Sequence, residues 1–431
     1  MKRRHFIAGT LGSAAALTLA ACSGNTEPGG GGGGATTVPS KPAEPVTLNF
    51  FTDKAAWEPS FKDMNTASAG QNMSLKFTGY SDPTAYDTFI KQSFRTKKIP
   101  DLFTWHTGSQ TQELVEQGLI AETSALWAKA ETDGLVPPGI KDNYTIEDKQ
   151  YGVPLNIAYW VMYYSKSVFE KHNLTPPTSF ADLLAMADTL VAAGVTPFHQ
   201  MNIIFEFVWF QALLMGSNPD VYDKLSRGEA KYTDDAVVKV AQQWSDMIGK
   251  KYFIDPGSTT DPQTLLKTGQ IAMIYMGTFF TGQLTASEMT SGKDYGAFVF
   301  PNMDPAVARP QMALETGPLL AGKGAANEAA ALAYSEWWMS TEAQKAWSTS
   351  RGDISFNPEV PSDDPEIGPI VKDIADKGKD FQVHTRYLEA TPNAIYTVAS
   401  EVFGKLVTDG GDPMPGLQKI QAAADEYWSS K

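Results

Sequence analysis

The sequence is poor in cysteine and histidine, and these shortages argue against disulfides and against metal sites. Cys22 is the only cysteine among 431 residues, so no disulfide can form within the chain. The histidines are scattered, with no pair four residues apart, so the pattern predicts no metal site and no cofactor. They are His5, His106, His172, His199 and His384. A surface calcium site is the one kind of metal site that stays open, at a carboxylate-rich loop such as residues 364–369.

Positive charge is also scarce. Lysine and arginine total 35 against 49 aspartate and glutamate residues, which gives a formal net charge of −14. An acidic surface repels phosphate backbones and anionic lipids, so nucleic acid is not expected as a partner. The length and the 42% hydrophobic share allow a sizeable core and two or three domains.

Signatures of catalysis are missing as well. The sequence has no G-x-S-x-G motif and no free cysteine after lipidation. Gly317, Gly322 and Lys323 fit a phosphate loop, but Gly324 stands where a serine or threonine would bind Mg²⁺. Residues 351–353 have the sequence RGD. A turn accounts for these three residues as well as an adhesion motif does. A secreted glycoside hydrolase stays open as an alternative. Such an enzyme needs a pair of carboxylates, and 49 acidic residues offer many pairs.

The first 45 residues are predicted to direct export and anchoring. Residues 1–21 have a basic start and an apolar stretch too short to span a membrane, which is typical of a signal peptide. The segment "LAAC" ending at Cys22 is similar to a bacterial lipobox, so we expect lipidation of Cys22. "RRHFI" resembles a twin-arginine export signal, and the export route stays open. Residues 22–45 are rich in Gly and Pro and predict a tether. These features together indicate an extracytoplasmic protein anchored to the cell membrane by lipid.

The body of the chain alternates strand and helix patterns. An amphipathic helix is expected after the capping residue Ser179 and ends near Gly194. The order strand, helix, strand predicts a parallel sheet with ligand-binding loops beyond the carboxyl ends of its strands. The predicted strands are residues 46–52, 72–80, 100–105, 161–166, 268–280 and 295–301, and further helices are expected at 327–340 and 419–428.

Aromatic residues are abundant at or near the predicted strand ends. Aromatic faces combined with polar neighbours suit the apolar faces and hydroxyl rim of a sugar ring. A core position explains any single one of them equally well, but their clustering favours a sugar. The residues are Trp57, Tyr80, Trp105, Tyr159, Trp160, Trp209 and Phe279.

Four segments in this order resemble the extracytoplasmic solute-binding lipoproteins of ABC importers, in particular the carbohydrate-binding family that includes maltose-binding protein. They are "PDLFTWHTGSQTQELVEQGLI", "YGVPLNIAYWVMYYSKSVFEKHNLTPPTSFADLL", "TGQIAMIYMGTFF" and "GPLLAGKGAANEAAALAYSEWWMSTEAQKAW". The chain departs from the family pattern at Ser165, which replaces an asparagine, and at Phe180. Phe279 stands where the family usually has a ligand-stacking tryptophan.

The resemblance implies an α/β fold of the type II periplasmic-binding-protein kind. Each of two lobes would hold a mainly parallel sheet flanked by helices, with the ligand cleft between the lobes. Lobe 1 would comprise residues 46–154 and 301–354, and lobe 2 residues 155–300 and 355–431. The chain would cross between the lobes near residues 153–156, at the start of the stretch 154–160, and again near Pro301 and Ser355, so the late strands would belong to the second sheet.

The resemblance also implies a non-enzymatic function. The protein would be a monomer that captures a mono- or oligosaccharide by hinge closure and delivers it to the permease subunits of an ABC transporter. By matching position, the expected ligand-binding residues are Trp57, Asp82, Trp105, His106, Asn156, Trp160, Trp209 and Phe279, with Glu315, Asp353 and Arg386 as polar contacts. Local alternatives remain: Trp105 packs on its own helix, Asp353 caps a turn, and Arg386 pairs with Glu389. A secreted hydrolase, a receptor for a non-sugar solute and an adhesion scaffold are the other functions left open.

Overall fold

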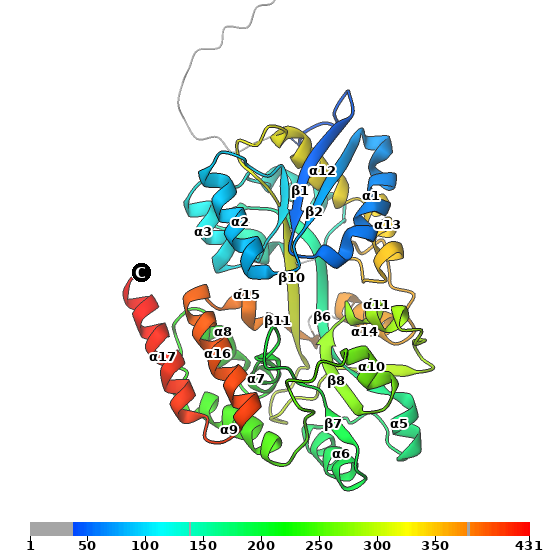
Figure 1. Ribbon diagram of the computed structural model, residues 1–431, viewed down its shortest axis with the longest axis vertical. Coiled ribbons are helices and arrows are strands. Elements are labelled where there is room, and N and C mark those ends of the chain that lie inside the picture. Colours follow the sequence, from blue (N-terminus) through cyan, green and yellow to red (C-terminus); the bar gives the residue numbers. More distant parts are fainter. Residues whose placement is uncertain (1–37, 138, 377–379) are drawn as a thin grey trace, which may run out of the picture. The chain divides into compact units, whose positions relative to one another are not determined.

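One mixed nine-stranded sheet organises the chain (Figure 1). The computed structural model describes residues 38–137, 139–376 and 380–431, so the signal segment, Cys22 and the first part of the tether lie outside the described residues. The strand order is β2-β1-β3-β10-β6-β8-β7, with β11 paired to β10 and β9 paired to β6. The strands are β1 Val46–Thr52, β2 Met73–Gly79, β3 Leu102–Thr104, β6 Val153–Ser165, β7 Thr196–Phe198, β8 Ile271–Gly277, β9 Tyr295–Phe298, β10 Gln311–Ala321 and β11 Gln382–Thr385.

Strands β1, β2 and β3 form a parallel group at one end of the sheet, as the alternating sequence pattern predicts. Burial alternates along β1, and its neighbours β2 and β3 both run parallel to it. Phe50 of β1 packs against Phe61 and Phe77, with ring centroids 4.6 and 6.0 Å away. Because these strands are parallel, their carboxyl ends lie together at one edge.

Two long antiparallel strands, β6 and β10, run through the middle of the sheet. The first part of β6 pairs with β10 from Val153 to Tyr159, and its second part pairs with β8 from Trp160 onward. The expected strand start at residue 161 is wrong, because β10 pairs with the backbone of residues 153–159 and the strand begins at Val153. The expected lobe crossing at residues 154–160 is thus part of this continuous strand.

The late strands β7, β8 and β9 form the other end of the same sheet. β7 runs parallel to β8, whereas β8 and β9 run antiparallel to β6. They group around β6 and β8, apart from β1–β3, and the long strands β6 and β10 connect the two groups in one hydrogen-bonded path.

Helices gather around both ends of the sheet (Figure 1). Around β1–β3 lie α1 Glu58–Ala67, α2 Pro83–Arg95, α3 Ser109–Glu116, α4 Ser124–Thr132, α12 Glu328–Trp338 and α13 Thr341–Arg351. Around the other end lie α5 Lys166–Lys171, α6 Phe180–Ala192, α7 Val208–Met215, α8 Pro219–Leu225, α9 Asp235–Gly249, α10 Pro262–Lys267, α11 Phe280–Ala286, α14 Ile367–Asp376, α15 Tyr387–Ala390, α16 Asn393–Asp409 and α17 Met414–Ser429. Short 3₁₀ turns are η1 Ala55–Trp57, η2 Ser68–Gln71 and η3 Ile140–Tyr144, and β4 Thr145–Ile146 pairs with β5 Lys149–Gln150.

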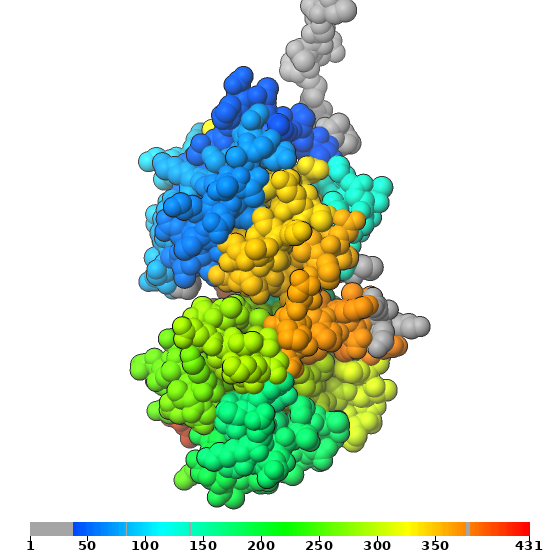
Figure 2. Space-filling model, turned by 90° about the vertical axis from the view of Figure 1, so that its right-hand side faces the viewer, coloured from blue at the N-terminus to red at the C-terminus, as the bar shows by residue number. Residues whose placement is uncertain are grey.

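Segments distant in sequence meet at the first end of the sheet. Figure 2 shows α12 and α13, in yellow and orange, beside α1, in blue. Phe61 of α1 packs against Trp338 and Trp347, with ring centroids 6.3 and 5.1 Å away. Residues 328–351 therefore complete the core that residues 46–132 begin.

Two local motifs of the sequence have structural roles. The phosphate-loop pattern begins at Gly317 inside strand β10, so it forms no glycine-rich loop before a helix. In the RGD segment, Arg351 ends α13, Gly352 supplies the left-handed turn with φ of 71°, and Asp353 is buried. The turn explains this tripeptide.

Candidate functional site

Polar side chains follow the carboxyl ends of β1 and β3. Asp53 comes directly after β1, accepts a hydrogen bond from the Thr104 hydroxyl at 2.9 Å and pairs with Lys54 at 2.8 Å. Burial would raise the pKa of Asp53, but Lys54 outweighs it and lowers the pKa to about 2. Burial lowers the pKa of His106, which follows β3, although Asp53 opposes the shift. Asp53 is therefore ionised and His106 neutral at physiological pH.

A buried ion network lies next to the middle strands β6 and β10. Glu315 of β10 pairs with Arg386 at 2.7 Å and accepts a hydrogen bond from the Trp160 indole at 3.1 Å. Arg386 also forms a bidentate pair with Glu389, at 2.8 and 2.5 Å. Burial would lower the pKa of Arg386, but Glu315 and Glu389 outweigh it and raise the pKa. One guanidinium thus holds two carboxylates.

Three aromatic rings form a wall beside this network. The Trp160 ring lies edge-on to Phe205 and Phe279, with centroids 5.2 and 6.2 Å apart. Phe205 and Phe279 stack at 6.3 Å. Trp160 is only 1% exposed, whereas the two phenylalanines are partly exposed. Phe205 and Phe279 therefore present the accessible aromatic surface, and Trp160 supports them.

Electrostatic contacts join the two groups. Burial raises the pKa of Glu315, and both Arg386 and Lys54 oppose that shift. Glu389 in turn acts on His106. Residues from β1 and β3 therefore face residues from β10 and the β11–α15 turn. We call the following set the strand-end cluster: Asp53, Lys54, His106, Trp160, Phe205, Phe279, Glu315, Arg386 and Glu389.

Trp57 extends this cluster along α13. The Lys54 ammonium lies 5.4 Å from its ring centroid, and the Arg351 guanidinium covers the ring at 4.3 Å. Arg351 also pairs with Asp353 at 3.3 Å. Burial raises the pKa of Asp353 to about 6, against the charge of Arg351. The other oxygen of Asp353, Oδ1, is buried without a partner.

The structure brings together some of the residues predicted from sequence and separates others. His106, Trp160, Phe279, Glu315 and Arg386 meet in the strand-end cluster, and Trp57 and Asp353 lie next to it through Lys54 and Arg351. The alternative for Arg386, a pair with Glu389, is present too, but the pair is buried instead of solvated.

Four predicted residues have other partners. Asp82 caps α2 by accepting hydrogen bonds from the Thr84 and Ala85 amides. Trp105 is 4% exposed and packs against Phe103 and Tyr86 beside its own helix α3. Trp209 is 1% exposed, donates its indole hydrogen to the His199 carbonyl and is enclosed by phenylalanines. Asn156 is buried on β6 opposite Gly317. Trp105, Trp209 and Asn156 are thus buried, whereas Asp82 is exposed and caps its helix.

Sequence reasoning missed several members of the cluster. Asp53 and Lys54 directly follow β1, so the rule that ligands bind beyond strand carboxyl ends could have found them. Phe205 and its neighbour Glu206 lie in a loop without a strand or helix pattern, and no sequence signal points to them.

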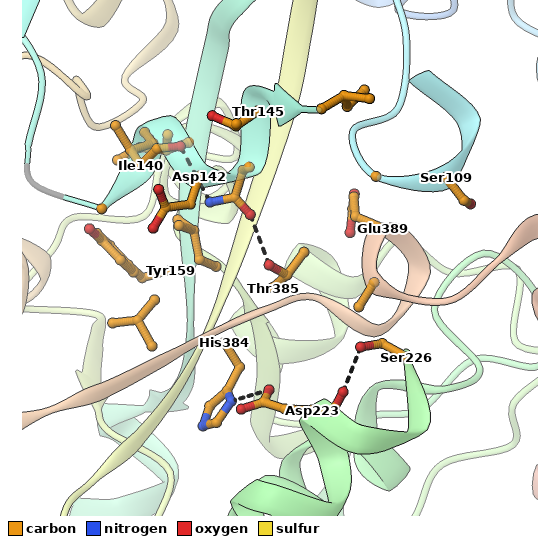
Figure 3. A pocket seen from close by; sticks show the side chains of 18 of the residues that line it. Ser109, Ile140, Asp142, Thr145, Tyr159, Asp223, Ser226, His384, Thr385 and Glu389 are labelled. Atoms are coloured by element: carbon orange, nitrogen blue, oxygen red, sulfur yellow. Dashed lines mark hydrogen bonds and ion pairs between the residues drawn. The ribbon is translucent and has the colours of Figure 1, made fainter. Parts of the chain in front are cut away.

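A cavity lies on the opposite face of the two long strands, and Glu389 of the strand-end cluster lines it as well (Figure 3). Residues directly opposite in antiparallel strands share a face, so Glu315 lies with Ala158 and Trp160, and Leu314 lies with Tyr159. The cavity has a volume of about 1090 Å³, and Ile157, Tyr159 and Leu314 line it from the strands. Adjacent residues of one strand therefore face different sites.

Polar groups surround this cavity on the other sides. Asp223 of α8 contacts His384 of β11 at 2.7 Å, and the Thr385 hydroxyl donates to Asn143 of η3 at 2.8 Å (Figure 3). The Thr385 contact joins segments from the two ends of the sheet. Burial raises the pKa of Tyr159 to about 12, and its hydroxyl has no hydrogen-bond partner among the described residues.

The described residues offer neither a metal site nor a membrane span. No group of three or more His, Cys, Asp or Glu side chains in the described ranges is placed to hold a metal ion. Within the same ranges, no helix is both long and apolar enough to cross a membrane.

Comparison with solved structures shows the fold. The chain superposes on a chitin oligosaccharide binding protein with a TM-score of 0.74 and 18% identity, covering 89% of this chain and 98% of that one. The solute receptor AcbH, described as having an exclusive preference for β-D-galactopyranose, gives a TM-score of 0.75 at 21% identity with the same coverage. Maltose-bound MalE3 of T. maritima gives 0.72 at 16% identity, with 89% and 100% coverage. The fold is therefore the two-lobed periplasmic-binding-protein fold.

Relatives found by sequence are also named as extracellular-binding or sugar-binding proteins. An "uncharacterized ABC transporter extracellular-binding protein" of Pyrococcus horikoshii is 31% identical over 157 residues, which are 34% of this chain and 37% of the relative. A "probable sugar-binding periplasmic protein" of Mesorhizobium japonicum is 24% identical over 205 residues, 44% of this chain and 47% of the relative. The chain thus matches less than half the length of these curated relatives. The family model of the bacterial extracellular solute-binding proteins matches residues 61–373, and this chain belongs to that family.

Proposed function

We propose that this protein is the substrate-binding component of an ABC importer and that it captures a sugar or oligosaccharide at the strand-end cluster. The observation that carries the proposal is the composition of the cluster. A partly exposed aromatic wall, Phe205 and Phe279, stands beside charged groups such as Lys54 and Glu315. Aromatic faces pack on the C–H faces of a sugar, and charged groups hydrogen-bond its hydroxyls. The sugar-binding relatives support this assignment.

We place the ligand between two lobes, residues 46–154 with 301–354 and residues 155–300 with 355–431. In this proposal, Asp53, Lys54 and His106 contact it from the first lobe, and Phe205 and Phe279 contact it from the second. Contacts from both lobes favour the closed form, which the membrane permease would recognise. The protein would act as a monomer and would not change the sugar chemically.

The family places the protein outside the cytoplasm, and we propose a lipid anchor in addition. The signal peptide would be residues 1–21, Cys22 would carry the lipid, and residues 22–45 would form the tether. A single acyl group gives only marginal membrane binding, so the multiple chains of a lipoprotein would hold the body at the membrane surface.

Isothermal titration of the full-length chain against mono- and oligosaccharides tests the proposal. We expect saturable binding of at least one sugar, and at least tenfold weaker binding of that sugar by Phe279→Ala. Phe298→Ala on β9 is the matched control, because Phe298 is also partly buried but packs against Tyr164, away from the cluster. Equal affinity of both variants would refute the site, and failure of every sugar to bind would refute the function.

Two further measurements separate the alternatives. New reducing ends after incubation with an oligosaccharide would favour a glycoside hydrolase. Binding of peptides, amines or metal ions without any sugar would favour another solute. Small-angle scattering with saturating sugar should show contraction, and an unchanged profile would favour a scaffold without hinge closure.

A further inference from the structure

We propose that the strand-end cluster selects a sugar that carries a protonated amino group. This inference rests on the proposed function and names the substrate class of that same site. It follows from the charge balance around the cluster, from one buried carboxylate oxygen without a partner, and from the way in which cations already lie on the aromatic rings.

Carboxylates outnumber cations around the cluster. Five carboxylates, Asp53, Asp87, Glu206, Glu315 and Glu389, stand against three cations, Lys54, Lys91 and Arg386. His106 is neutral because burial lowers its pKa. The formal balance is therefore −2, and a sugar acid or a phosphorylated sugar would be repelled.

Other charged groups nearby leave the balance negative. Lys91 of α2, which acts on Asp87, is exposed and lies 6.0 Å from the Trp105 ring centroid. Arg351 pairs with Asp353, whose pKa burial raises to about 6, so this pair adds less than one positive charge beside Trp57 at pH 6. The two cations of the cluster are occupied as well, since Lys54 pairs with Asp53 and the three guanidinium nitrogens of Arg386 contact Glu315 and Glu389.

Glu206 provides the strongest single indication. It directly follows Phe205 of the aromatic wall and is 1% exposed. Its Oε1 accepts a hydrogen bond from the Tyr396 hydroxyl at 3.2 Å, whereas Oε2 is buried and has no hydrogen-bond partner among the described residues. Glu206 and Arg386 both act electrostatically on Tyr396, so Glu206 lies beside the ion network. An unsatisfied buried carboxylate is costly, and an ammonium group from a ligand would satisfy it.

The aromatic rings are compatible with a cation. The Arg386 guanidinium lies 5.9 Å from the Trp160 centroid and 5.8 Å from that of Phe205. Trp57 is approached by Lys54 and Arg351 in the same manner. Ring faces attract positive charge, so an aminated sugar gains from the wall as well as from the carboxylates. An ammonium group also brings three hydrogen-bond donors, the groups that unpaired carboxylates lack.

Matched sugars that differ at one position test the proposal. Isothermal titration at pH 6 and low salt compares the 2-amino, 2-acetamido and 2-hydroxy forms of the same ring, in the glucose and galactose series, as monosaccharides and β-1,4-linked trisaccharides. We expect an amino form to bind at least tenfold more tightly than its acetamido and hydroxy partners. Its affinity should fall with added salt and with rising pH, as the sugar amine loses its proton.

Glu206→Gln should reduce affinity for the amino sugar about tenfold and leave the hydroxy sugar within twofold, a loss of about 1.4 kcal/mol in the first case. Glu401→Gln is the control, because Glu401 is exposed and pairs with Lys419 on the surface of α16. If Glu206→Gln does not fold, Asp87→Asn is used in its place, because Asp87 is a less buried member of the five carboxylates.

Two outcomes have different meanings. If any neutral sugar binds as tightly as every amino sugar, the amine preference is overturned while the sugar-binding function stands. If no carbohydrate binds, the proposed function itself fails.

Discussion

Replacing Asp353 by asparagine should stabilise the protein at neutral pH. Asp353 is 5% exposed, and within the described part of the chain one of its oxygens has no hydrogen-bond partner while the other accepts from Arg351 at 3.3 Å. Burial raises the pKa of Asp353 from 3.8 to about 6, although Arg351 opposes the shift. The folded protein therefore keeps this carboxyl protonated at pH values where the unfolded chain has released the proton.

The direction of the pH dependence follows from proton binding. Between about pH 4 and pH 6 the native state binds more protons at this site than the unfolded state, so stability falls as pH rises through that window. Because burial raises this pKa by about 2, the free energy of unfolding is lower by about 3 kcal/mol once the pH is above 6. The asparagine amide keeps an unpaired group at the same place, which costs about 1 kcal/mol. The net gain expected at pH 7.5 is therefore about 2 kcal/mol.

Urea unfolding followed by circular dichroism at pH 4 and pH 7.5 measures this effect. The variant should be close to or slightly below the unsubstituted protein in stability at pH 4 and above it at pH 7.5. Asp425→Asn, which changes an exposed carboxylate of α17, serves as the control and should show no such dependence. A stability difference that is the same at both pH values, or a variant that is less stable at pH 7.5, would refute the reasoning.

Three further changes test the core, the backbone and the anchor. Trp209→Phe removes a buried indole hydrogen bond and should lower the unfolding free energy by about 2–3 kcal/mol while leaving sugar affinity unchanged in titrations. Gly152→Ala should cost about 1–3 kcal/mol in urea unfolding, because Gly152 has φ of 74° and an added Cβ would lie 2.5 Å from Leu320, whereas Gly249→Ala has open space and should cost nothing. Cys22→Ser should move the protein from the membrane fraction to the soluble fraction on cell fractionation, and an unchanged distribution would contradict the lipid anchor.

The parallel strands and several helices were predictable because their patterns are local. The alternation of β1 is visible in residues 46–52, and β1 has these same bounds. Helix α6 begins after Ser179, whose side chain accepts a hydrogen bond from the Asp182 amide, as the capping pattern indicates. Such features depend on a few neighbouring residues, so one sequence is enough to find them.

The candidate site was predicted only in part, because a buried aromatic residue and a ligand-binding one have the same local sequence. Trp105 follows β3 in the manner of a ligand residue and Trp209 lies at the start of α7, but aromatic rings from other segments, such as Tyr86 and Phe300, pack against them. Phe205 joins the aromatic wall from a loop without any periodic pattern. Which aromatic residues stay accessible depends on packing between segments that the sequence does not bring together.

The long strand β6 shows the limit most clearly. In a half-buried strand, alternation of polar and apolar residues reveals which side chains share a face. β6 is buried on both faces, so that signal is absent between Val153 and Tyr163. Yet Trp160 supports the aromatic wall while Tyr159 lines the cavity on the other face, and only the pairing with β10 distinguishes them. Sequence could place this stretch at the centre of the molecule, but the register of a strand more than 150 residues away decides which of its side chains faces the proposed ligand.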